Sequence, residues 1–140
     1  MASTIVLIAA KPVTFRSPTA VKNEAKSLLL RIDADARLAA AAGGAARFLG
    51  DDAGLSTDAS NQLQSSVLAA CLAEFPKLAQ SRSCVEITLT RYSDRLEIAL
   101  AHPGGGSTAD SPAVSAGVDT IQHEARNGQS ITRLTKFLSQ

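Results

Sequence analysis

The chain has 140 residues, of which 45% are apolar and 19% are charged, a composition typical of one folded domain and not of a disordered chain. Its 14 basic and 13 acidic side chains leave a net charge of +1, which excludes a global electrostatic attraction to nucleic acid or to an anionic membrane. Aromatic residues make up only 4%, so we expect a core of small and aliphatic side chains and no extended base-stacking surface.

Residues 1–26 show a weak pattern, and we interpret them as a partly ordered lead-in to a single domain at residues 27–140. The apolar run from Ile5 to Ala10 has no basic segment before it, and Lys11 and Pro12 end it too early for a membrane span. It is therefore interpreted as a poorly ordered or strand-like tail, and we expect a cytoplasmic protein with no membrane partner.

A short strand is predicted at residues 27–32, and Asp33 and Asp35 after it are carboxylate N-caps for a helix that reaches about Gly50. An apolar stripe predicts the core-facing side of this helix: Leu38, Ala41, Ala45, Phe48 and Leu49. Gly43 and Gly44 each cost about 1 kcal/mol relative to alanine in a helix interior, which the close approach of another element would explain.

A second amphipathic helix is predicted from about residue 58 to residue 78, after a stop at Gly54 and fresh capping residues. Its apolar residues recur at three- and four-residue steps: Leu63, Val67, Ala70, Cys71 and Phe75. Neither Cys71 nor Cys84 has a metal ligand at a typical spacing, so we expect both thiols to be buried and reduced.

The pattern then changes to the period of two that is typical of strands, over residues 85–90 and 96–100, with a tight turn at residues 92–95. Three glycines at 104–106 begin a loop, and a second hairpin is predicted at residues 118–125 and 130–138, turned at Asn127-Gly128. Two helices followed by antiparallel strands predict an α+β fold: a two-layer sandwich with the helices packed on one face of a mostly antiparallel sheet.

The two helices and the segments after them resemble the histidine-kinase-like (GHKL or Bergerat) ATPase domain in its anti-sigma-factor serine-kinase, or RsbW-like, branch. The likeness spans about residues 28–138 and includes a closing strand with Arg133-Leu134-Thr135-Lys136. In that family the second helix carries a catalytic glutamate and, four residues later, a Mg²⁺-binding asparagine. An Asp-x-Gly-x-Gly loop after the strand hairpin reads the adenine, and a lid with a further helix follows.

The resemblance implies a degenerate nucleotide cleft at Ala69, Ala73, His102, Gly104 and Gly106. Ala69 and Ala73 occupy the glutamate and asparagine positions, and a methyl group can neither ligate Mg²⁺ nor accept a proton. His102 occupies the aspartate position, while Gly104 and Gly106 keep both glycines. Only eleven residues separate Gly106 from Val118, so the lid is truncated. We therefore predict no catalytic residue, no metal site and no cofactor.

Four other features have simpler interpretations. His102 continues the alternation of Leu96, Ile98 and Leu100, so it should face the core. We favour a satisfied strand-end histidine, and the alternative is a ligand contact or pH-sensitive switch at the remnant cleft. His123 should face solvent, and Glu74, about 100° around the helix from Ala73, is expected to be solvated or at the rim of the cleft. The basic group in the last hairpin is interpreted as a solvated face: Arg126, Arg133 and Lys136.

The favoured function is a regulatory protein-binding module that resembles an anti-sigma factor or partner-switching kinase without its ATP and Mg²⁺ sites. Its expected partner is a protein such as a sigma factor or a STAS-type antagonist, with a homodimer as a further contact of the same kind. Two alternatives stay open: an active ATP- and Mg²⁺-dependent serine kinase or ATPase, and a small-ligand sensor that uses the remnant cleft.

Overall fold

The computed structural model describes residues 5–9, 26–78, 84–103 and 117–138. Within these ranges two helices and six strands follow one another: β1 (Ile5–Ala9), β2 (Lys26–Ile32), α1 (Ala36–Asp52), α2 (Thr57–Leu78), β3 (Val85–Arg91), β4 (Arg95–Pro103), β5 (Thr120–Arg126) and β6 (Gln129–Phe137). Neither of the helices in these segments combines the length and the apolar character that a membrane crossing requires.

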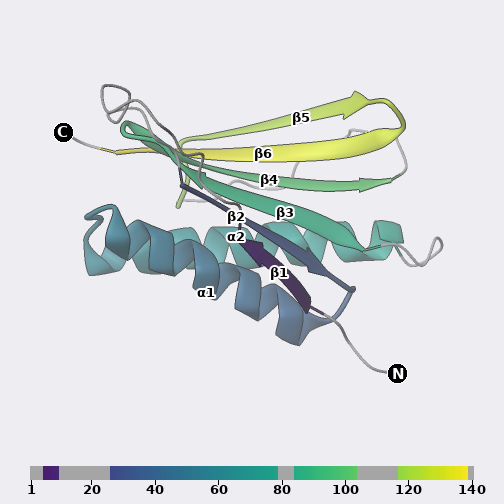
Figure 1. The fold of residues 1–140 in the computed structure, drawn as a ribbon, viewed down its shortest axis with the longest axis horizontal. Coiled ribbons are helices and arrows are strands. Elements are labelled where there is room, and N and C mark those ends of the chain that lie inside the picture. Colours follow the sequence, from purple (N-terminus) through teal and green to yellow (C-terminus); the bar gives the residue numbers. More distant parts are fainter. Residues whose placement is uncertain (1–4, 10–25, 79–83, 104–116, 139–140) are drawn as a thin grey trace.

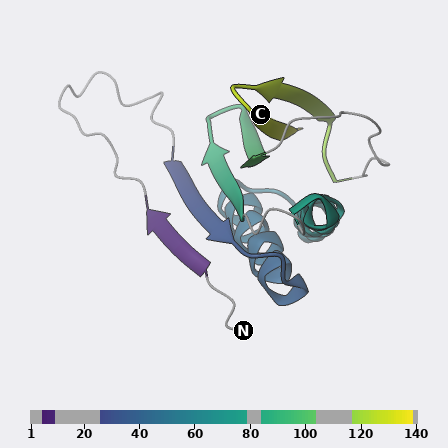
Figure 2. The ribbon, with the colours of Figure 1, turned by 90° about the vertical axis from the view of Figure 1, so that its right-hand side faces the viewer.

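The strands form one sheet in the order β1-β2-β3-β4-β6-β5, and every neighbouring pair is antiparallel. Figures 1 and 2 show α1 and α2 side by side beneath one face of this sheet. The predicted α+β two-layer arrangement is therefore confirmed. The strand-like interpretation of the apolar run near the N-terminus is confirmed as well, because β1 pairs with β2 at an edge of the sheet.

Both helices begin at residues that can cap them. Asp35 has extended backbone angles, and its carboxylate accepts a hydrogen bond of 2.8 Å from the backbone N–H of Arg37 at the start of α1. The Ser56 hydroxyl accepts one of 3.1 Å from the N–H of Ala59 at the start of α2. Gly54, with φ of 91°, makes the turn between the helices. These local signals explain why the predicted helix bounds lie within two residues of the observed ones.

The predicted core-facing stripe of α1 is confirmed in part: Leu49 is buried and Leu38 and Ala45 pack against the core, but two of its members are wrong. Ala41 and Phe48 are exposed, Phe48 by 65% of its surface, whereas the residues that face inward are Ala39, Ala42, Gly43, Ala46, Leu49 and Gly50. Two of these residues, Gly43 and Gly50, lie where α2 approaches closely, so a side chain there would be crowded. A Cβ on Gly43 would lie 3.0 Å from the Gln64 carbonyl oxygen, and one on Gly50 would lie 3.0 Å from the Ser60 hydroxyl.

The core lies between the helices and strands β2, β3, β4 and β6 and is built from aliphatic side chains, as the composition predicted. From α2, Leu63, Val67 and Cys71 are fully buried, which confirms the predicted face of this helix. The alternating residues of β3 and β4 complete the layer: Val85, Ile87, Leu89, Leu96, Ile98 and Leu100. Both cysteines are free thiols, but Cys84 is only partly buried, so the prediction of two buried thiols holds for Cys71 alone.

The two predicted turns are confirmed. The backbone N–H of Tyr92 donates to the Arg95 carbonyl at 2.8 Å and closes the β3–β4 hairpin. In the β5–β6 hairpin, Asn127 and Gly128 have φ of 53° and 78°, the left-handed pair that a two-residue turn between twisted strands requires.

Candidate functional site

The five residues of the predicted cleft differ in position and burial. Ala69 and Ala73 lie one turn apart on α2, and both are exposed. His102 lies near the end of β4 and is buried, with 4% of its surface exposed. Gly104 and Gly106 lie outside the described residues. The structure brings α2 and the end of β4 together, because Glu74, the neighbour of Ala73, contacts His102 directly.

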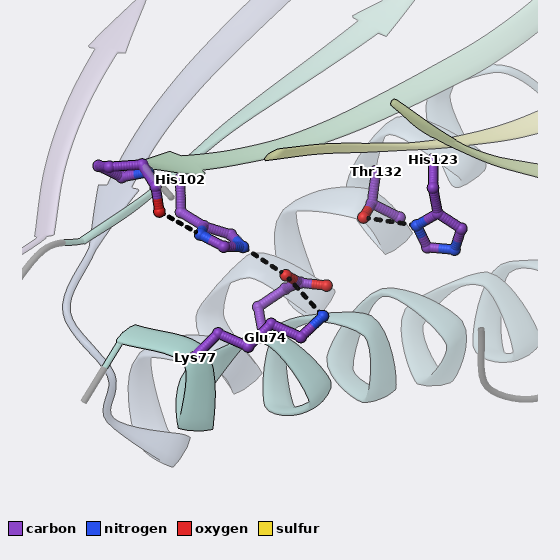
Figure 3. A network of polar contacts seen from close by, with 6 residues as sticks. Glu74, Lys77, His102, His123 and Thr132 are labelled. Carbon is purple, nitrogen blue, oxygen red and sulfur yellow. Dashed lines mark hydrogen bonds and ion pairs between the residues drawn. The ribbon is translucent and has the colours of Figure 1, made fainter. Parts of the chain in front are cut away.

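Both ring nitrogens of His102 have hydrogen-bond partners. Nε2 lies 2.7 Å from Oε1 of Glu74, and Nδ1 lies 2.9 Å from the carbonyl oxygen of Pro103 (Figure 3). The imidazole points to the same face of the sheet as Leu100, as the alternation along β4 predicted. This side chain is therefore fully engaged within the protein, and it offers no free nitrogen to a bound molecule.

The expectation that Glu74 is solvated or at the rim is wrong, because only 4% of this residue is exposed. Glu74 follows Val67 and Cys71 at steps of four and three, and Leu78 comes four residues later, so all four share the buried face of α2. That spacing was visible in the sequence, but a charged residue within an apolar pattern is normally assigned to solvent. Its partner, His102, lies 28 positions further along the chain, beyond the reach of helical periodicity.

Lys77 adds a third polar side chain to this contact. Its Nζ lies 3.6 Å from the same Glu74 oxygen, while more than half of its own side chain is exposed (Figure 3). The carboxylate therefore has two nitrogen partners, one buried and one facing water. Breaking a buried pair by removing one partner costs about 3–5 kcal/mol, since the remaining charge is left without compensation.

A second contact connects Gly117, just before β5, to Ser66, which lies eight residues before Glu74 on α2. The backbone N–H of Gly117 donates to the Ser66 hydroxyl at 3.1 Å, and that hydroxyl donates in turn to the Gln62 carbonyl at 3.0 Å. Both ends of the interval at residues 104–116 are thus attached to α2, at points about 12 Å apart along the helix axis. Ala69 and Ala73 lie between the two points, at exposed positions.

The buried thiol beside this contact is not a nucleophile. Burial, with a smaller effect of the Glu74 charge, raises the pKa of Cys71 to about 12, so the sulfur stays protonated in the physiological range. A thiolate is the reactive form of cysteine, and this environment disfavours it. A Cys–His catalytic pair is therefore not available here.

The three cations of the predicted solvated face have carboxylate neighbours and do not share one face of the hairpin, because Arg133 and Lys136 lie on opposite sides of β6. Arg126 and Arg133 lie 3.5 Å and 3.3 Å from the Glu124 carboxylate, and Lys136 lies 3.9 Å from Asp119. His123 is exposed as expected, with Nδ1 3.1 Å from the Thr132 hydroxyl. The two arginines share the single Glu124 carboxylate.

A hollow of about 320 Å³ lies at the other end of the helix pair, lined mainly by Leu55, Ser56, Lys136, Phe137 and Leu138. It is formed by the turn between α1 and α2 and by the end of β6, and Ala69, Ala73 and His102 do not line it. Phe137 at its rim is 53% exposed.

The residues at the predicted nucleotide positions do not fit Mg²⁺ or ATP. Ala69 and Ala73 supply no oxygen ligand, which Mg²⁺ requires, and His102 is held by Glu74 and Pro103. Phosphoryl transfer depends on positioned charge and metal, so we derive no catalytic step at this site.

No family model matches the sequence, and no curated protein matches it either. The resemblance to the anti-sigma-factor branch of the histidine-kinase-like ATPases therefore remains a prediction, carried by the motifs of the chain itself.

Proposed function

We propose that the chain is a regulatory protein-binding module, similar to an anti-sigma factor or partner-switching kinase that lacks the ATP and Mg²⁺ sites. The observation that carries the proposal is the solvent side of α1. Residues 38–46 contain only leucine, alanine and glycine, and Ala40, Ala41 and Phe48 are exposed. A surface helix normally presents charged side chains to water, so an apolar solvent side indicates a surface that another molecule covers.

The shape and the surroundings of this surface also suit a protein partner. A Cβ added to Gly44 would meet nothing within 4 Å, so the middle of the helix is open and has no bulky side chain. Arg37 lies before the apolar stretch, and Arg47 and Asp51 lie after it, 3.8 Å from each other. An apolar centre with charged residues at its ends is the usual organisation of a protein–protein interface.

The family resemblance suggests a sigma factor or a STAS-type antagonist as the partner. A protein of this kind could bind α1 without any nucleotide chemistry, because the apolar surface does not depend on Ala69, Ala73 or His102. The kinase and the small-ligand sensor remain alternatives, and both require a ligand at the remnant cleft.

The first experiment separates these functions by thermal unfolding with millimolar ATP, with and without Mg²⁺. A ligand at 100 times its Kd stabilises the native state by about 2.7 kcal/mol, which raises the unfolding midpoint clearly. We expect no rise. A Mg²⁺-dependent rise would restore the kinase alternative, and a rise with a metabolite but without metal would support the sensor.

The second experiment tests the α1 surface with immobilised wild-type protein, Phe48→Asp and Phe137→Asp, each exposed to lysate of the source cells. Phe48 and Phe137 are both more than half exposed but lie on α1 and β6, so the second variant is a matched control. We expect a partner that the wild type and Phe137→Asp retain and Phe48→Asp loses. Equal retention by all three proteins would rule out α1 as the binding surface.

A further inference from the structure

The solvent side of α1 has the residue spacing of a helix that packs against another helix. Along it, five residues recur at alternating steps of four and three: Arg37, Ala41, Gly44, Phe48 and Asp51. Four of them are exposed and Gly44 is partly exposed, whereas the opposite side of the helix is buried. The helix α1 therefore already packs against α2 on one side and has the spacing for a second helix on the other.

The charges at the two ends of α1 are the reverse of those that a helix dipole favours. Acidic side chains stabilise the first turn of a helix and basic side chains stabilise the last turn. Within Ala36–Asp52, Arg37 lies in the first turn, which has no acidic residue, and Asp51 and Asp52 lie in the last turn, which has no basic residue. This arrangement disfavours α1 alone, but it suits a second helix of the same sequence that runs in the opposite direction.

A second copy of this chain matches both the spacing and the charges. If two α1 helices cross antiparallel with a twofold axis beside Gly44, each residue lies opposite the one equally far on the other side of Gly44. Arg37, seven residues before Gly44, then lies opposite Asp51, seven residues after it. Ala40, four residues before, lies opposite Phe48, four residues after. The symmetry repeats each contact, so this register brings together two pairs of opposite charges and packs two aromatic rings against alanines.

The two adjacent glycines of α1 face different neighbours. A Cβ on Gly43 would lie 3.0 Å from the Gln64 carbonyl oxygen of α2, so this glycine permits the contact between the two helices. A Cβ on Gly44 would meet nothing within 4 Å among the described residues, so the packing of its own chain does not require a glycine there. Glycine disfavours a helix interior relative to alanine. A close crossing by a helix of another chain explains why Gly44 is present.

We propose that the chain forms a symmetric homodimer in which the α1 helices of two copies pack antiparallel and cross at Gly44. This inference rests on the proposed function, because it uses the same apolar surface of α1, and it names a second copy as the molecule that covers this surface until the partner protein displaces it. With 17 residues, α1 offers a strip about 25 Å long and about 10 Å wide, which is smaller than the roughly 800 Å² per partner of a standard interface. The dimer is therefore weak and depends on concentration, so that a partner protein can compete with it.

Analytical ultracentrifugation of the purified chain tests the dimer and its register at low salt. The wild type should change from monomer to dimer between about 10 μM and about 1 mM. Arg37→Asp places two carboxylates opposite each other at both ends of the contact, and Asp51→Arg places two guanidinium groups there. Each variant should raise the dissociation constant about tenfold. An equimolar mixture of the two variants should dimerise like the wild type, because every opposed pair again has opposite charges. Both variants should fold, since each puts the charge that the dipole favours at its end of α1.

Gly44→Leu provides a test that does not depend on charge. Its side chain begins in open space in one chain but lies at the crossing point of two, so this variant should fold and stay monomeric at about 1 mM. A wild type that is still monomeric at this concentration would overturn the proposal, and so would a dimer that all the variants form equally well. Neither result affects the proposed function, because the pull-down with Phe48→Asp asks for a different protein, which is identified by its mass.

Discussion

Gly117 offers a sharp test of the packing against α2. In Gly117→Ala, the new methyl carbon would lie 2.2 Å from the Gln62 carbonyl oxygen and 2.4 Å from the Ser66 hydroxyl. Ordinary contact begins near 3.4 Å, so the chain must move by about 1 Å. The Gln62 oxygen belongs to the backbone of a helix, which cannot rotate away as a flexible side chain could. The segment before β5 must therefore move instead.

The expected loss of stability has two parts. Moving Gly117 breaks the hydrogen bond from its N–H to the Ser66 hydroxyl, which contributes about 0.5–1.5 kcal/mol. Crowding in a well-packed contact costs a further 1–3 kcal/mol or so. We expect Gly117→Ala to lower the free energy of unfolding by about 2–4 kcal/mol, a large part of the total for a domain of this size.

Urea unfolding followed by circular dichroism measures this change, and with an m-value of about 2 kcal/mol/M the midpoint should fall by about 1–2 M. Gly44→Ala is the matched control, because its Cβ meets nothing within 4 Å and it lies inside α1. That variant should gain about 1 kcal/mol from helix propensity. If Gly117→Ala were as stable as wild type, the close contact between Gly117 and α2 would be refuted.

Three further predictions concern caps, buried hydroxyls and thiols. Within the described residues, the Ser60 hydroxyl is buried without a hydrogen-bond partner. Ser60→Ala should therefore stabilise the protein by about 1 kcal/mol in the same urea assay. A loss of stability would show that the hydroxyl has a partner. Asp35→Ala removes the N-cap of α1 and should cost about 1 kcal/mol, whereas an unchanged midpoint would show that the cap is dispensable. In a thiol-reagent assay at pH 8, the partly exposed Cys84 should react quickly. Cys71 should react only as fast as the protein opens, because burial raises its pKa to about 12. Fast reaction of both thiols would contradict this prediction.

The pattern of the chain was sufficient for the elements and for the fold class. Helix starts follow from Asp35 and from the residues after Gly54, and the β5–β6 turn follows from Asn127-Gly128. The alternation along β3 and β4 predicted which side chains face the helices, including His102. These signals are local: each depends on a cap, a turn or a period within a few neighbouring residues.

The orientation of α1 was not predictable in the same way. Hydrophobicity favoured Phe48 as a core residue, but the glycines at positions 43 and 50 have no side chain and so carry no hydrophobic signal. Both glycines nevertheless face α2 at close range, while Phe48 lies in solvent. An apolar residue on a helix is therefore a candidate for the core or for an interface, and only the neighbouring helix decides between them.

For the candidate site, too, some features followed from the sequence and others only from the tertiary structure. The sequence by itself determined that Ala69 and Ala73 bring no metal ligand or base and that His102 points toward the helices. Only the tertiary structure paired His102 with Glu74, 28 residues away, and set Gly117 against Ser66, 51 residues away. The physical reason is that burying a polar group costs free energy unless it has a hydrogen-bond partner, and partners so distant in the chain meet only once the helices pack on the sheet.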